Sequence, residues 1–264
     1  RFDRNFERDP GIHFPRVYPE LSTSKVLTME RLDGFSLADE EQLESSGLDS
    51  KRIAERGATA YLDMIFRDAF YHADPHPGNL LILQGGVIGF LDCGMVGRLD
   101  DETRRQFESL LMSAMDKDGA RLARTLMQLG TTPRDLDERA FTAEVSEFAD
   151  DFLSVDLTDF DMAATVEAGT DLIRRYRIVL RPSISLLIKA LLLLEGTSRL
   201  VDRSFSIAEL LRPYYAKIVR RQYSPRKLVA RVQQSYRDWE RLLDVLPGEV
   251  ASILSQVKQG TVRV

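Results

Sequence analysis

Hydrophobic and polar residues follow two different patterns along the chain, and the pattern changes near Asp100. Before this point, two extended segments, FPRVYPEL and KVLTMERLDG, precede a helix, and the apolar runs LLIL and VIGFLD flank Gln84-Gly85-Gly86. Short apolar runs on either side of a glycine-rich turn predict a β-hairpin. After Asp100, apolar residues recur only at the three- and four-residue spacing of helices. The sequence therefore predicts an α+β protein that is mainly helical.

Start and stop signals bound the expected helices. We expect a short helix that Ser36 caps and Gly47 ends, followed by a longer helix that begins near Asp49. Apolar residues recur with helical spacing in the longer helix up to Ala69. The later helices are predicted at 101–116, 118–129, 133–153, 162–175, 182–201, 207–221 and 225–246.

Composition narrows the class of protein. With 44% hydrophobic and 29% charged residues in 264, the chain is globular and can bury a large core. The net charge of -5 argues against nucleic acid as a partner. The single cysteine, Cys93, excludes an intramolecular disulfide and favours a reducing, cytosol-facing setting. The most apolar run, ISLLIKALLLLEG, is interrupted by Lys189 and is too short to be a transmembrane segment, so it predicts a buried helix.

Charge is unevenly distributed in the helical part. Residues 131–171 contain twelve acidic and two basic side chains, whereas residues 201–246 contain ten basic and five acidic ones. We favour two solvated faces, or two faces that meet, because charge runs are usually exposed. The alternative is that the basic helices, with their interleaved tyrosines, rest on an anionic membrane surface.

The stretch YHADPHPGN, which precedes LLIL, contains the densest group of reactive side chains. His72, Asp74 and His76 alternate, and imidazole with carboxylate is a ligand set that suits zinc. A zinc hydrolase is therefore one hypothesis. The only other histidine, His13, lies far away in the sequence, and no further ligand stands at a recognisable spacing.

Other members of this stretch indicate phosphoryl transfer. Asn79 follows Asp74 by five residues, and Asp92 follows Asn79 by thirteen, at the end of VIGFLD. Phosphoryl transfer needs one carboxylate to orient the attacking hydroxyl, and an amide oxygen and a second carboxylate to hold magnesium. A third interpretation is a plain turn in which Asp74 and Asn79 cap backbone groups. The order of the set, between a helix and a hairpin, favours phosphoryl transfer.

These residues resemble the UbiB/AarF-like atypical kinases, a family tied to isoprenoid-quinone metabolism. The blocks VLTMERLDG, HADPHPGNLL, LDCGMVGRL and LLIKALLLLEGTSRLVD resemble that family's blocks in their order, over residues 14–201. The resemblance implies a protein-kinase-like C-terminal lobe with a helical extension. Residues 1–34 would be a remnant of the small lobe with the hinge strand, and residues 35–264 would be the helical large lobe.

The resemblance also implies a role for each residue of the site. Asp74 would be the catalytic aspartate, and Asn79 and Asp92 would hold Mg2+. Met29 would lie at the back of the nucleotide pocket, and the backbone of Glu30 to Leu32 would face adenine. Leu81 would lie beneath adenine, and His76 would lie at the transferring phosphate.

Departures from the kinase pattern limit the expected chemistry. Cys93 replaces the aromatic residue expected after the magnesium aspartate, and Ala73 stands where many kinases have an arginine. Only MVGRL separates Gly94 from Asp100, which leaves no room for an activation loop. We therefore expect a small or lipid-like acceptor, or plain ATP hydrolysis, rather than a protein substrate.

Upstream of the hinge there is no glycine-rich loop and no lysine placed for the ion pair that kinases require. We expect the chain to be part of a longer atypical kinase or ATPase at the cytoplasmic face of a membrane, and to be inactive alone. Its expected partners are ATP, a quinone-precursor or lipid acceptor, a membrane surface and quinone-biosynthesis enzymes, in ubiquinone or membrane-lipid metabolism. The alternative is a non-catalytic, ATP-gated scaffold for those enzymes.

Overall fold

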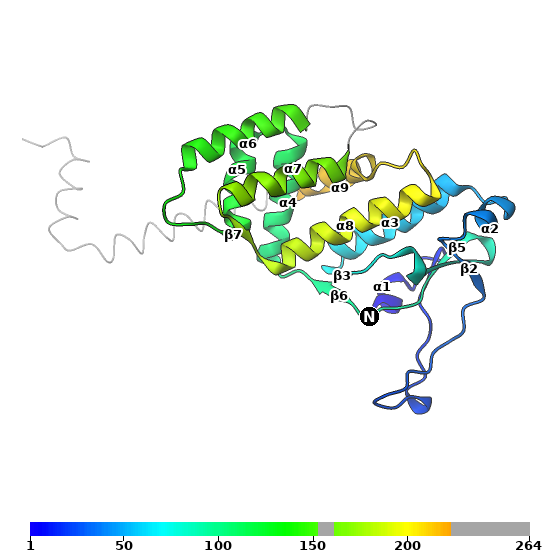
Figure 1. The fold of residues 1–264 in the computed structure, drawn as a ribbon. Helices are drawn as coiled ribbons and strands as arrows, with labels where there is room; N and C mark the ends of the chain where they lie inside the picture. The colour runs from blue at the N-terminus through cyan, green and yellow to red at the C-terminus, as the bar shows by residue number, and fades with distance from the viewer. Residues whose placement is uncertain (153–160, 223–264) are drawn as a thin grey trace, which may run out of the picture. The chain divides into compact units, whose positions relative to one another are not determined.

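The structure, a computed structural model, describes residues 1–152 and 161–222. Helices make up most of this part, and most of the short strands belong to its first hundred residues (Figure 1). The predicted α+β, mainly helical class is therefore confirmed. The chain divides into two compact units, residues 1–215 and 216–264. The first unit contains every residue of the expected site. The predicted helix at 225–246 lies outside the described residues.

A four-stranded sheet carries the predicted hairpin. Its order is β1 (Ile12–His13), β5 (Val87–Phe90), β4 (Leu80–Leu83) and β2 (Gly34–Ser36), with β1 parallel to β5 and the other pairs antiparallel. Gly85 and Gly86 have φ of 75° and 74° in the turn between β4 and β5, a conformation that glycine adopts without strain. The hairpin is confirmed, while β1 and β2 were not expected.

A second, two-stranded sheet lies where the sequence analysis expected no strand. β3 (Phe70–His72) pairs antiparallel with β6 (Val96–Arg98), and Tyr71 lies opposite Gly97. A Cβ atom on Gly97 would come within 2.1 Å of Cζ of Tyr71, so the ring needs glycine there. The prediction that only helices follow Asp100 is wrong in a small way, because β7 (Gly130–Thr131) pairs with β8 (Val179–Leu180).

The two extended segments near the N-terminus meet each other. Val17 forms an isolated bridge with Met29, and the N–H of Tyr18 donates to the carbonyl of Thr28 at 2.9 Å. They form an antiparallel arm, interrupted by a 3-10 turn at Pro19–Leu21, that projects from the sheet in Figure 1. The short helix α1 (Phe2–Phe6), which was not predicted, precedes the arm.

Aspartate caps decide where the first helices begin. α2 (Glu40–Ser45) is capped by Asp39, whose Oδ1 accepts from the N–H of Gln42 at 3.0 Å. The expected cap at Ser36 is wrong because Ser36 still belongs to the extended strand β2. α3 (Ser50–Phe66) begins after its cap Asp49, as predicted.

The later helices follow the predicted boundaries closely. The helix predicted from Pro133 begins five residues late because Asp137 accepts from the N–H groups of Arg139 and Ala140 and so caps it. The observed helices are α4 (Asp101–Met115), α5 (Gly119–Leu129), α6 (Glu138–Phe152), α7 (Met162–Arg175), α8 (Pro182–Val201) and α9 (Ile207–Gln222).

α8 is the buried helix that the apolar run predicted. It lies beside α3 in Figure 1, and Ile184 and Leu187 are fully buried. Each such side chain stabilises the fold by about 1.5–3 kcal/mol relative to an exposed one. A second apolar cluster, around Phe141 and Val145, joins α5, α6 and α7. None of the described helices combines the length and the apolar character that crossing a membrane requires.

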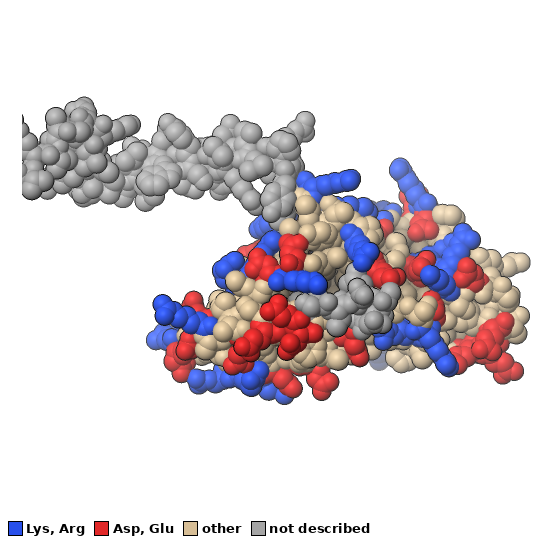
Figure 2. Space-filling model, turned by 90° about the horizontal axis from the view of Figure 1, so that it is seen from above, with Lys and Arg blue, Asp and Glu red and all other residues tan. Residues whose placement is uncertain are grey.

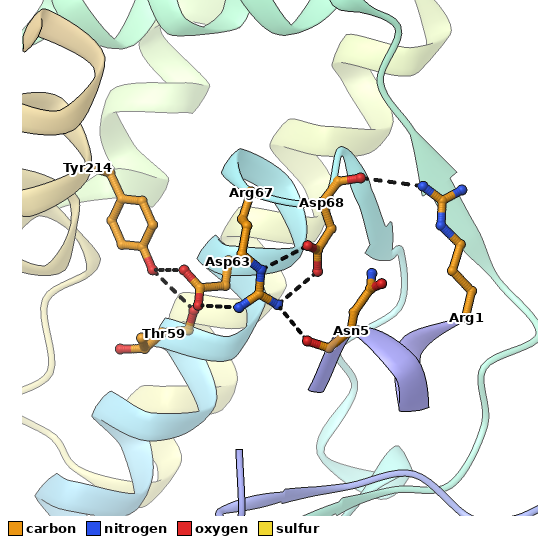
Figure 3. A network of polar contacts seen from close by, with 7 residues as sticks. All are labelled: Arg1, Asn5, Thr59, Asp63, Arg67, Asp68 and Tyr214. Atoms are coloured by element: carbon orange, nitrogen blue, oxygen red, sulfur yellow. Dashed lines mark hydrogen bonds and ion pairs between the residues drawn. The ribbon is translucent and has the colours of Figure 1, made fainter. Parts of the chain in front are cut away.

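Arg67 at the end of α3 joins three helices (Figure 3). Its guanidinium lies 3.0 Å from Oδ2 of Asp63 and 2.8 Å from Oδ1 of Asp68, and it donates to the carbonyl of Asn5 in α1. The hydroxyl of Tyr214, in α9, donates to Oδ1 of Asp63 at 2.7 Å. The network therefore ties α1 and the first turns of α9 to α3.

Acidic and basic side chains are interspersed on the face that Figure 2 shows. Several carboxylates of the acid-rich segment pair with arginines of α7 and its end, among them Glu144 with Arg175 at 2.9 Å and Asp135 with Arg177 at 2.8 Å. These pairs are largely exposed and add little stability. They fit the interpretation of the acid-rich segment as a solvated face.

Candidate functional site

The expected site residues lie on two neighbouring connections. Residues 73–79 join β3 to β4, and residues 91–95 join β5 to β6. Because β3 pairs with β6 and β4 with β5, the two connections lie together at the same end of the strands. The N–H of Ala73 donates to the carbonyl of Met95 at 3.0 Å, and that of Leu91 donates to the carbonyl of Asn79 at 2.9 Å.

His72 holds both connections with its two ring nitrogens. Its Nδ1 accepts from the N–H of Asp74 at 3.1 Å, and its Nε2 makes a short contact with the carbonyl oxygen of Asp92. This arrangement assigns the proton to Nε2 and requires a neutral ring. Burial lowers the pKa of His72 and so favours the neutral form, against a smaller opposite effect of the Asp92 carbonyl.

The oxygen atoms near this junction suit a magnesium ion. The side-chain amide nitrogen of Asn79 faces the carbonyl of Asp74 at 3.4 Å, which leaves the amide oxygen as the free end of the group. The carboxylate of Asp92 is exposed, and its Oδ1 accepts from the N–H of Gly94 at 2.7 Å. An amide oxygen and a carboxylate are ligands that Mg2+ prefers. The residues present therefore fit the ion.

A cavity of about 860 Å³ adjoins the second connection. This volume lies in the range of cofactor and ligand pockets. Met29 and Asp92, two of the expected site residues, line the same cavity from opposite parts of the sequence. The remaining lining comes from α1, the arm and the connection: Arg1, Phe2, Asp3, Phe14, Pro15, Arg16, Val17, Leu27, Leu91, Cys93 and Gly94.

Other expected residues lie apart from this cavity. Glu30 and Leu32 line a separate cavity of about 590 Å³. Oε2 of Glu30 accepts from the N–H of Arg16 at 3.0 Å and lies 3.0 Å from Nε2 of His13. The hydrogen bond from Arg16 lowers the pKa of Glu30 most, and the contact with His13 lowers it further. Leu81 is half-buried within β4.

His76 and Cys93 have different surroundings on the two connections. His76 is exposed, and its Nδ1 accepts from the N–H of Gly78 at 3.1 Å, which caps the turn at Pro77–Asn79. Cys93 is partly buried, and burial, helped by the nearby charge of Asp92, raises the pKa of its thiol to about 11. The thiol is therefore neutral near pH 7.

One side of the cavity is an aromatic wall that was not predicted. The ring of Phe14 stacks on that of Phe2 at 5.2 Å and on that of Phe90 at 4.7 Å, measured between centroids. Phe2 also lies 6.4 Å from the ring of His72. The i, i+4 spacing of Phe2 and Phe6 was the one sequence signal for a buried helix there.

The zinc hypothesis has no ligand set in the described part of the chain. Within residues 1–152 and 161–222, no group of three or more His, Cys, Asp or Glu side chains is placed to hold a metal ion. Both ring nitrogens of His72 are engaged with the backbone. The alternating histidines therefore shape the loop in this structure.

Two known protein domains match the chain in succession. Residues 1–126 match the ABC1 atypical kinase-like domain, and residues 145–206 match the UbiB helical domain. The chain belongs to the UbiB-like atypical kinase family. The resemblance of the sequence blocks and the kinase-like, mainly helical fold are thereby confirmed.

Relatives in this family cover nearly the whole chain. A probable protein kinase UbiB from Pasteurella multocida is 29% identical over 259 residues, which are 96% of this chain and 49% of the relative. One from Shewanella pealeana is 30% identical over 248 residues, 92% of this chain and 45% of the relative. One from Vibrio parahaemolyticus is 29% identical over 259 residues, 97% and 48% respectively. The chain thus spans about half the length of the curated relatives it matches.

Proposed function

We propose that the protein binds ATP with Mg2+ and hydrolyses it, or transfers its terminal phosphoryl group to a small or lipid-like acceptor. The observation that carries the proposal is the junction of the two connections. His72 bonds to the backbone of both Asp74 and Asp92, and Asn79 forms hydrogen bonds with both connections. A cavity large enough for a nucleotide lies beside them. Membership of an atypical kinase family supports the same chemistry.

Each residue has a distinct role in this proposal. Asp74 orients the attacking hydroxyl or water. Asn79 and Asp92 would hold a magnesium ion, which would supply positive charge to offset that of the phosphates. Phe2 and Phe14 of the aromatic wall, together with Met29, give one side of the cavity an apolar lining. We further assign the backbone of Glu30 to Leu32 and the side chain of Leu81 to adenine, and His76 to the phosphates. None of these residues lines the cavity of about 860 Å³, so these contacts require the nucleotide to extend beyond it.

We propose that residues 1–264 supply a kinase-like site only in part. We assign residues 1–34 to a remnant of the small lobe with the hinge, and residues 35–264 to the large lobe. The glycine-rich cover and the ion-pair lysine of kinases have no counterpart in the residues before the hinge. Transfer by residues 1–264 alone is therefore expected to be weak or absent.

The acceptor class follows from the short second connection. Five residues, Met95 to Leu99, separate Gly94 from the cap of α4 at Asp100, and three of them form β6. No platform for a peptide substrate fits there, so we propose a quinone precursor or a membrane lipid as the acceptor. We propose that the protein meets this acceptor at the cytoplasmic face of a membrane, together with quinone-biosynthesis enzymes. The matched relatives are named probable protein kinases, so a protein acceptor is an outcome that the test must resolve.

One observation favours a second candidate, a scaffold that binds ATP without transferring phosphate. Asp92 and Met29 line the large cavity, but Asp74 does not. A nucleotide in this cavity would meet the magnesium ligand and the hinge without meeting the proposed catalytic aspartate. Such a site could switch a conformation on binding alone.

Phosphate release by the full-length protein separates the two candidates. Wild-type protein, Asp74→Asn and Asp92→Asn are compared for Mg2+-dependent ATP binding and phosphate release. Transfer predicts that Asp74→Asn keeps binding and loses release by roughly a hundred-fold or more, because the aspartate acts in the transition state. A scaffold predicts binding without release in the wild type. Asp74-dependent phosphorylation of a protein partner would contradict the small-acceptor assignment.

A further inference from the structure

A hydrogen bond connects the proposed catalytic loop to a helix 122 residues further along the chain. The hydroxyl of Thr197, in α8, donates to the carbonyl oxygen of Pro75 at 2.8 Å. Both residues are buried, and Thr197 is only 4% exposed. Pro75 belongs to the segment that matches the atypical kinase-like domain, whereas Thr197 belongs to the segment that matches the helical domain.

This use of a helical threonine differs from that of three other threonines in the described helices. The hydroxyls of Thr125, Thr142 and Thr165 donate to carbonyls four residues earlier, within or at the start of their own helices. Such local bonds are the usual choice for threonine in a helix. Thr197 instead donates across to the loop.

The receiving carbonyl controls the backbone next to Asp74. Proline fixes its own φ near -65° and restricts the residue before it, so the segment Asp74-Pro75 has few conformations. Fixing the carbonyl of Pro75 also fixes the plane of the peptide that leads to His76. The rest of the loop is held from the other side by His72 and by the N–H of Ala73.

We propose that Thr197 is a positioning residue for phosphoryl transfer, which holds the backbone of Asp74 in place through the carbonyl of Pro75. The proposal rests on the proposed function of Asp74. In this proposal α8 supports the catalytic loop, so the segment that matches the helical domain contributes to the geometry of the kinase-like site.

The test compares three variants of the full-length protein. Thr197→Val keeps the shape and removes the hydroxyl, whereas Thr197→Ser keeps the hydroxyl. Thr125→Val removes an equally buried hydroxyl that donates to the carbonyl of Arg121 in its own helix and lies 3.4 Å from the hydroxyl of Ser109 in α4, away from the catalytic loop. It controls for the general effect of such a loss on stability.

We expect Thr197→Val to lower kcat for phosphate release by roughly 10- to 100-fold, because small misplacements near the reacting groups have effects of this size. The KM for MgATP should change by less than about three-fold, because Met29 and Asp92 are untouched. Thr197→Ser should keep most of the wild-type kcat, and Thr125→Val should keep the wild-type kcat. Hydrogen exchange of residues 73–80 should accelerate in Thr197→Val and not in Thr125→Val.

The outcomes separate this proposal from the proposed function. Wild-type turnover that Thr197→Val leaves unchanged, or that Thr125→Val lowers equally, overturns the positioning role alone. Unchanged exchange of residues 73–80 overturns it as well. Absence of Asp74-dependent turnover in the wild type overturns the proposed function and, with it, the catalytic role of Thr197.

Discussion

Removal of the hydroxyl group should change the stability of the protein in opposite directions at two buried tyrosines. The hydroxyl of Tyr214 donates to Oδ1 of Asp63 at 2.7 Å, within the network of Figure 3. The hydroxyl of Tyr61 is buried and has no hydrogen-bond partner in the described part of the chain. Burial raises the pKa of both phenols, so both are neutral donors. Tyr214→Phe and Tyr61→Phe therefore remove a satisfied and an unsatisfied donor.

The expected magnitudes follow from these partners. A hydrogen bond to a charged group contributes roughly 1.5–3 kcal/mol, and Asp63 keeps its pair with Arg67, so Tyr214→Phe should lower the free energy of unfolding by about 1.5–2 kcal/mol. An unpaired buried hydroxyl destabilises by about 1–3 kcal/mol in proteins. Tyr61→Phe keeps the ring contacts with His72 and Phe90. It should therefore raise the free energy of unfolding by about 1 kcal/mol.

Urea denaturation of both variants measures these changes directly. The m-value should stay constant, and the two midpoints should move to opposite sides of the wild-type midpoint. Thermal midpoints should move with them, by roughly 2–4 °C for each kcal/mol in a protein of this size. A loss of stability in Tyr61→Phe similar to that in Tyr214→Phe would show that the Tyr61 hydroxyl has a partner, and would refute the reasoning.

Two further predictions concern groups that titrate at the junction of the connections. Because burial lowers the pKa of His72 in the folded state, the unfolded chain binds a proton at higher pH, and stability should fall as pH drops through about 6.5. The free energy of unfolding between pH 7.5 and 5.5 should fall less steeply in His72→Gln; equal slopes would contradict this. Because burial raises the pKa of Cys93 to about 11, its alkylation by iodoacetamide should keep accelerating above pH 10. A plateau below pH 9 would contradict that value.

Long periodic segments were predicted well, and short strands were not. The bounds of α7 and α8 follow from many apolar residues at helical spacing, together with the cap Asp161 at the start of α7 and Pro182 at the first position of α8. Strands β1, β3 and β6 have two or three residues, too few for a period, and their pairing depends on partners far away in the sequence. Ser36 was the predicted cap of α2, but its pairing within β2 keeps it in the extended strand, and Asp39 caps the helix instead.

The order of the site residues could be inferred, but their supports could not. Asp74, Asn79 and Asp92 have a recognisable spacing around a hairpin that the sequence also predicts. The contact between Thr197 and Pro75 joins residues that no local pattern relates. The wall formed by Phe2 and Phe14 depends on how a short helix meets the sheet, which the sequence does not encode locally.

The most direct test of the central claim is the magnesium dependence of ATP affinity in the full-length protein. Wild-type protein is compared with Asp92→Asn and with Asp135→Asn, an exposed carboxylate in the acid-rich segment that serves as control. We expect Mg2+ to tighten ATP binding in the wild type and in Asp135→Asn, and Asp92→Asn to lose at least about ten-fold of that gain, since a ligand to the ion is weakened. Equal magnesium dependence in all three proteins would contradict the assignment of a kinase-like nucleotide site to this junction.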